Sequence, residues 1–133
     1  MDIAKFYAGE KLYRAVKPMQ PFIEDGEISS AAFTQKKNIK SGLSVDKQAH
    51  RSNEEAVSFI ASSKLGYIVS ITTNDCDFKN VGYEYCKTED NLYHSEIYGN
   101  KEEGKFSLTK GQAKHMARVC KIELVRDDLG NDD

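Results

Sequence analysis

The sequence contains no tryptophan, only two prolines and only three cysteines among its 133 residues. The cysteines are Cys76, Cys86 and Cys120, an odd set without C-x-x-C spacing. Disulfide frameworks of secreted domains and structural zinc sites use paired cysteines at regular spacings. We therefore expect three reduced thiols, neither a disulfide framework nor a zinc knuckle, and no metal site.

Long apolar runs and an excess of positive charge are also missing. No apolar stretch approaches the length that spans a bilayer, and residues 1–6 lack the basic and apolar segments of a secretory signal. Acidic and basic residues nearly balance, at 21 and 19, and the basic cluster of Lys36, Lys37 and Lys40 is typical of a solvated loop. We therefore expect a cytoplasmic protein with no membrane contact and no nucleic-acid partner.

The length of the chain fits one domain, and its seven tyrosines and six phenylalanines indicate a folded core. Short β-prone runs are followed by turn residues at 12–16, 43–45, 67–73, 83–86 and 93–98. The segment 28–33 fits either an extended piece or one helical turn, and 46–51 is expected to be a polar loop. We therefore predict one domain over residues 1–126, with an acidic tail at 127–133.

Two capping boxes, at Ser52–Glu55 and Thr109–Gln112, predict the starts of two helices. The first should run over residues 53–63, bury Val57 and Ile60, and end near Gly66. The second should be followed by a strand at 119–125. The predicted fold is α+β: a single compact domain with a mixed or antiparallel sheet and two principal helices.

In the last predicted strand the apolar and charged residues alternate. This pattern predicts that Cys120, Ile122 and Leu124 face the core while Lys121 and Glu123 face solvent.

Arg14 lies in the middle of an otherwise apolar predicted strand. Its planar guanidinium suits a phosphate or carboxylate ligand, whereas the alternative is a solvent-facing side chain on an edge strand. Buried unpaired charge is rare, which favours the alternative. His94 and Glu96 are two residues apart, so they share one face of a strand, where a carboxylate could fix the imidazole tautomer. An ordinary surface pair is the alternative there.

The segments 12–16, 28–33 and 43–46, together with His94 and Gly99, resemble a recurrent pattern in a set of small uncharacterised bacterial proteins. An Arg on a first strand, a Ser on a later strand and a Glu in the next helix are more distantly similar to RES-type domains. These belong to the ADP-ribosyltransferase-like superfamily, and some of them consume NAD as toxins.

The second resemblance implies roles for particular residues. Arg14 would hold the phosphates of NAD and Ser44 would fix the nicotinamide ribose. Glu55 or Glu96 would stabilise the oxocarbenium-like charge of the transition state. With His94, these are the predicted site residues, and NAD is the expected substrate.

Two classes of function stay open at this point. One is a small nucleotide-handling enzyme of the toxin or defence type, with a nucleotide as its ligand. The other is a non-catalytic interaction module, an antitoxin-like or immunity-like partner that would use its tyrosines at a protein interface. An enzyme requires the predicted site residues to meet in one concave pocket, whereas an interaction module requires only an exposed aromatic patch.

Overall fold

The computed structural model describes residues 2–35, 42–64, 66–99 and 107–126. The strands are β1 (Lys11–Val16), β2 (Ile23–Glu24), β3 (Glu27–Ile28), β4 (Leu43–Lys47), β5 (Tyr67–Thr72), β6 (Gly82–Tyr85), β7 (His94–Tyr98) and β8 (Lys121–Leu124). The helices are α1 (Asn53–Ser63), α2 (Thr73–Phe78) and α3 (Lys110–Val119), with a 3-10 turn, η1, at Ser30–Phe33. The predicted acidic tail and the basic cluster at 36–40 lie outside the described residues.

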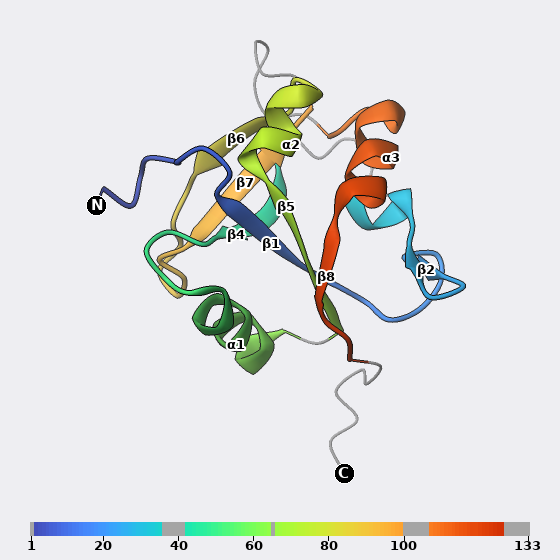
Figure 1. Ribbon diagram of the computed structural model, residues 1–133, viewed down its shortest axis with the longest axis horizontal. Helices are drawn as coiled ribbons and strands as arrows, with labels where there is room; N and C mark the ends of the chain where they lie inside the picture. The colour runs from blue at the N-terminus through green and yellow to red at the C-terminus, as the bar shows by residue number, and fades with distance from the viewer. Residues whose placement is uncertain (1, 36–41, 65, 100–106, 127–133) are drawn as a thin grey trace.

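Six of these strands form one antiparallel sheet in the order β6-β7-β4-β1-β5-β8, and β2 pairs with β3 in a separate hairpin (Figure 1). The described ranges thus form a single compact α+β domain, as predicted. Successive residues of a strand point to opposite faces of the sheet. Tyr13 therefore faces one side and Leu12 the other, and each residue belongs to a different hydrophobic cluster.

Helix α1 covers one face of the sheet, which we call the α1 face. Both hydrogen bonds of the predicted capping box are present: Ser52 Oγ accepts from the Glu55 amide, and Glu55 Oε1 accepts from the Ser52 amide. Ile60 is buried against Tyr13 and Ile68 of the sheet. The predicted start and end of this helix and the burial of Ile60 are confirmed, whereas Val57 is only partly buried against the same cluster.

The opposite face, the α3 face, carries the larger core, packed beneath η1, α2 and α3. The second predicted capping box is also present, between Thr109 and Gln112. Helix α2 was not predicted, because Thr73–Phe78 contains Asn and two Asp residues, which are typical of turns. Thr72 ends β5 and caps this short helix through the Asp75 amide.

The predicted sidedness of the last strand is wrong at Ile122 and Glu123, whereas Lys121 is exposed and Cys120 and Leu124 pack against the core, as predicted. The register of β5 with β8 shifts from Ile68 opposite Leu124 to Val69 opposite Ile122, so Glu123 is an extra residue in a β-bulge. The bulge turns Glu123 inward, where only 4% of its side chain is exposed, and leaves Ile122 36% exposed. Three donors satisfy the Glu123 carboxylate, namely Lys11, Asn53 and Ser70.

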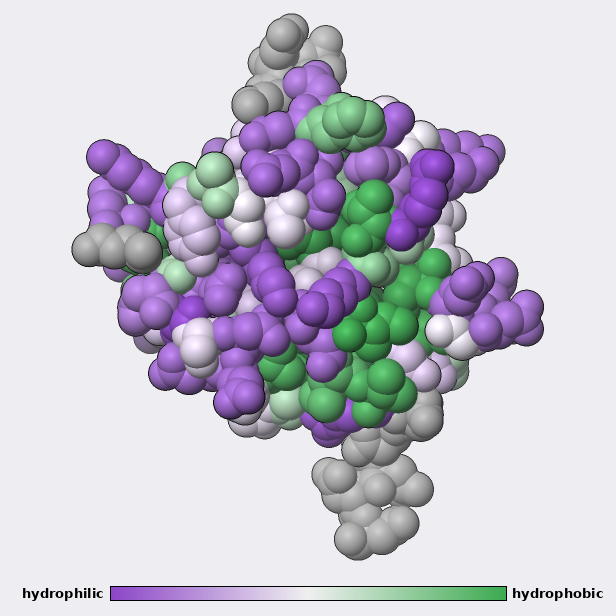
Figure 2. Space-filling view, in the orientation of Figure 1, coloured by the Kyte–Doolittle hydropathy of each residue, from purple (hydrophilic) through white to green (hydrophobic). Residues whose placement is uncertain are grey.

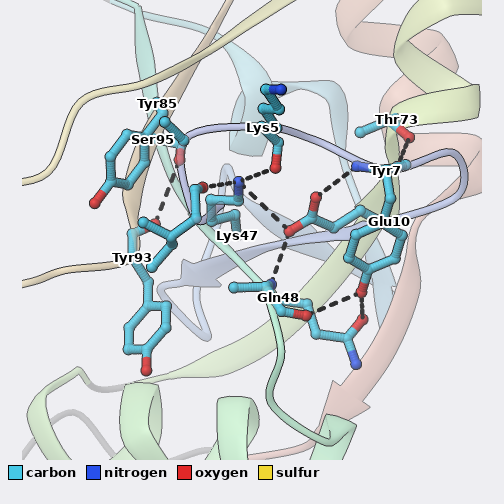
Figure 3. Close-up of polar contacts among 12 residues, drawn as sticks. Lys5, Tyr7, Glu10, Lys47, Gln48, Thr73, Tyr85, Tyr93 and Ser95 are labelled. Atoms are coloured by element: carbon cyan, nitrogen blue, oxygen red, sulfur yellow. Dashed lines mark hydrogen bonds and ion pairs between the residues drawn. The ribbon is translucent and has the colours of Figure 1, made fainter. Parts of the chain in front are cut away.

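Strand β4 extends beyond the predicted run and ends at Lys47, within the predicted polar loop. The Lys47 side chain is completely buried on the α3 face, where its ammonium lies 4.0 Å from the centre of the Phe6 ring. The ammonium donates to the carbonyl groups of Ile3 and Lys5 (Figure 3). Lys47 therefore ties the N-terminal segment to the inner strands of the sheet.

Candidate functional site

Helix α1 leaves part of its own sheet face open, and a cleft of about 570 Å³ lies there. Its floor is formed by Tyr13, Ser44, Asp46 and His94, and its walls by the end of α1, including Phe59 and Lys64, and by residues 88–91 between β6 and β7. Ser44 is exposed although β4 lies in the interior of the sheet. The cleft thus presents polar side chains of the inner strands to solvent.

Ser44 and His94 are brought together by the pairing of β4 with β7. Asp46 lies opposite His94 in the register, and the Ser44 hydroxyl lies 3.3 Å from His94 Nε2. His94 Nδ1 lies 2.9 Å from the carbonyl oxygen of Cys86. A carbonyl only accepts, so Nδ1 carries the proton in this contact and Nε2 is left to accept from Ser44. This arrangement resembles a hydroxyl nucleophile with an oriented general base.

Arg14 lies where β1 and β4 diverge. The ladder between these strands ends at the pair Tyr13 and Asp46, and beyond it the guanidinium donates to two carbonyl groups, 2.7 Å to Ala32 and 2.9 Å to Ser44. β1 is an interior strand, so the alternative of a side chain on an edge strand is wrong.

Among the described residues the charge of Arg14 has no acidic partner. Burial lowers the pKa of its guanidinium to about 10, so the group is still a cation at neutral pH. Within the described ranges no carboxylate lies within salt-bridge distance of Arg14. Arg14 is among the residues that line the cleft, although its side chain leaves β1 on the α3 face, like that of Leu12, and the guanidinium lies in the gap between β1 and β4. An anionic ligand would supply the missing charge.

Asp46 is the carboxylate of the cleft floor and was not among the predicted site residues. Burial raises the pKa of Asp46, although a hydrogen bond of 3.0 Å from the Asn91 amide opposes the shift. A signal for Asp46 was available, because it lies two residues after Ser44 and so on the same face of a strand. The cleft therefore combines a cation, a hydroxyl, an imidazole and a carboxylate.

The two predicted glutamates lie elsewhere. Glu55 closes the capping box of α1, and the backbone hydrogen bond from Ser52 lowers its pKa; it does not line the cleft. Glu96 shares its strand face with His94, and its Oε1 accepts from the Gly42 amide at 3.1 Å, but it does not line the cleft either. The structure thus brings together Arg14, Ser44 and His94 of the five predicted site residues.

A second group of polar side chains lies beside the cleft, on β7 and at the end of β6. Donor atoms of Cys86, His94 and Glu96 lie within 4.8 Å of one another, a set that could hold a metal ion. The spacing between cysteines does not reveal this group, because only one of its three members is a cysteine. All three cysteines are free thiols, as predicted.

The tyrosines differ in burial and in hydrogen bonding. Tyr13 is buried, and the hydroxyl groups of Tyr83 and Tyr85 donate to Asp77 and to the Leu92 carbonyl. Figure 2 shows the apolar surface instead on the side of β8, where Ile122 and Val125 are exposed. No helix in the described part of the chain has the length and apolar character to cross a membrane.

Comparisons with known proteins found no match for this chain. The resemblances stated for the sequence therefore stay expectations, and the proposed function depends on the chemistry of the cleft. The chain matches no protein-family model, no curated protein and no solved structure.

Proposed function

We propose that the cleft binds a small ligand that carries phosphate groups, with NAD as the expected nucleotide, and that Arg14 recognises the phosphate. The observation that carries this proposal is the charge of Arg14, which no carboxylate of the described residues pairs. A guanidinium has five N–H donors, and two of them are used by the Ala32 and Ser44 carbonyls. The remaining three suit the oxygens of a phosphate.

The neighbours of Arg14 fit the rest of such a ligand. Lys64 adds a second cation at the wall of the cleft. The Ser44 hydroxyl is exposed and lies within reach of His94 Nε2, so this pair can hold or activate a hydroxyl group of a ribose. If the glycosidic bond of NAD is broken here, Asp46 is the carboxylate placed to stabilise the developing positive charge, in place of Glu55 or Glu96.

Calorimetry with NAD and with ADP-ribose tests the proposal. Arg14→Lys keeps the charge but loses the planar fork, and Ser44→Ala removes an exposed hydroxyl without touching the core. Arg14→Lys is expected to weaken binding about 10-fold or more, because a hydrogen bond to a charged group contributes about 1.5–3 kcal/mol. Ser44→Ala is expected to weaken it about 2- to 10-fold, because a hydrogen bond to a neutral hydroxyl contributes about 0.5–1.5 kcal/mol. Arg118→Gln, on α3 and outside this cleft, is the control and should bind like the parent.

The absence of heat at millimolar NAD and ADP-ribose, with both variants folded by circular dichroism, would overturn the proposal. Loss of NAD over hours in the presence of the parent, but not of Ser44→Ala, would identify the protein as a catalyst. Without ligand binding, the non-catalytic interaction module predicted from the sequence becomes the better explanation.

A further inference from the structure

The strands β6 and β7 carry an unusual set of side chains on the open part of the α1 face. The register places Glu84 directly opposite Glu96, and the Cys86 amide donates to the His94 carbonyl at 3.1 Å, which continues the same ladder. Directly opposite residues of an antiparallel pair share one face of the sheet. Cys86, His94, Glu84 and Glu96 therefore form a compact patch with two facing carboxylates.

Glu84 and Glu96 place two carboxylates in directly opposite positions on this face. Beside the two carboxylates lie a thiol and an imidazole, which bind transition metals rather than calcium or magnesium. The chemistry of this patch is thus that of a site for zinc or a similar ion.

The distances agree with this chemistry. Cys86 Sγ lies 3.5 Å from His94 Nδ1. In a tetrahedral zinc site, Zn–S and Zn–N bonds of about 2.3 and 2.0 Å place the two ligand atoms about 3.5 Å apart. The donor atoms of Cys86, His94 and Glu96 all lie within 4.8 Å of one another, so one ion can lie within reach of all three.

We propose that Cys86, His94 and Glu96 bind one zinc ion, whose fourth position is open to water or to a ligand. Three protein ligands and an open position are the pattern of catalytic rather than structural zinc sites. All three side chains are partly exposed, so an ion can reach them from solvent. Binding converts the Cys86 thiol into a thiolate, and the displaced proton passes to solvent.

An ion bound to His94 Nδ1 replaces the proton that this atom donates to the Cys86 carbonyl at 2.9 Å, so that hydrogen bond is lost, while others hold the remaining ligand atoms. The Gly42 amide orients the Glu96 carboxylate through Oε1, and no side chain fits at Gly42, where a Cβ would lie 2.7 Å from the Ile97 carbonyl. With Nδ1 bound to the ion, His94 Nε2 must carry the proton and donate to the Ser44 hydroxyl, 3.3 Å away. In the metal-bound protein His94 is therefore no longer a base for Ser44.

Titration of the full chain with Co²⁺ tests the site, because a cobalt–thiolate bond gives a charge-transfer band in the near ultraviolet. We expect a saturable band at one ion per chain, displaced by Zn²⁺. Cys86→Ser should abolish the band, and His94→Gln and Glu96→Gln should weaken binding at least 10-fold. Cys120→Ser is the matched control: this partly buried thiol lies at the end of α3, away from the site, and the band should persist.

Failure to observe the band in the parent, or its survival in Cys86→Ser, would overturn the proposal. A second readout does not depend on the folding of any variant: Zn²⁺ should raise the melting temperature of the parent, as any ligand selective for the native state does, and an unchanged melting temperature counts against the site. The site does not rest on the proposed function, since Arg14→Lys should lose nucleotide affinity and keep the cobalt band.

Discussion

Lys47 Nζ lies 3.9 Å from Glu10 Oε2, and neither side chain is exposed to solvent (Figure 3). The Glu10 carboxylate also accepts hydrogen bonds from the amides of Tyr7 and Ala49, at 3.1 and 2.7 Å. Burial lowers the pKa of the Lys47 ammonium, while the charge of Glu10 opposes that shift. The pair thus joins the segment before β1 to the end of β4, and each charge makes the burial of the other tolerable.

Glu10→Gln is expected to lower the free energy of unfolding by about 3–5 kcal/mol, because it leaves the Lys47 ammonium buried without its counter-charge. Urea unfolding followed by circular dichroism measures the change. Glu24→Gln, at an exposed position on β2, is the control and should stay within about 0.5 kcal/mol of the parent. In the double variant Glu10→Gln, Lys47→Met part of the loss should be recovered; strictly additive losses would contradict the pairing.

Ile60→Ala is expected to cost about 2–5 kcal/mol, because it removes a buried side chain between α1 and the sheet and leaves a cavity. The denaturant midpoint at constant slope reports this loss. Ser62→Ala, an exposed change on the same helix, should leave the midpoint close to that of the parent. Equal midpoints for the two variants would mean that α1 buries a different side.

Ser52→Ala is expected to cost about 1 kcal/mol through loss of the hydrogen bond to the Glu55 amide. Thr109→Ala removes the equivalent bond to the Gln112 amide in α3 and should have a similar effect. Thermal unfolding of both variants checks the two values side by side. Unchanged stability in either variant would show that water replaces the cap at that helix start.

The starts and buried sides of these two helices can be predicted because the signals for them lie close together in the sequence. A capping box lies within four consecutive residues, so both its partners are visible in the sequence, and the buried side follows from the helical period. Strands β1, β4, β5 and β7 were also predicted from short β-prone runs. The residues Arg14, Ser44 and His94 were selected by chemical type, whereas their meeting in one cleft depends on the register of three strands.

The failures concern properties that the local sequence does not contain. The inward turn of Glu123 depends on a bulge against β5, and the burial of Lys47 depends on the N-terminal segment that packs over it. Cys86 and His94 are eight residues apart, and only the register of β6 with β7 places them opposite one another. Such a pair cannot be predicted from the spacing between cysteines, because it depends on how the strands pair.

Glu123 provides a test of how stability depends on pH. Burial acts to raise its pKa, but hydrogen bonds from Lys11, Ser70 and Asn53 outweigh burial and hold the pKa below 4.5, its ordinary value. In the window between the lowered pKa and 4.5, the unfolded chain binds more protons at this group than the folded chain. Stability from Glu123 is therefore complete above pH 4.5 and is lost as the pH falls through the window.

Glu123→Gln removes this titration, so the variant should be less stable than the parent at pH 7. The difference between their free energies of unfolding, the gap, should narrow as the pH falls below 4.5. Urea midpoints measured for both proteins between pH 7 and about pH 3 give the gap directly. Asp46, whose pKa burial raises, contributes with the opposite sign, but it is present in both proteins and cancels in the difference. A gap that stays constant across this range would contradict the role of the Glu123 carboxylate as an ionised acceptor for Lys11 and Ser70.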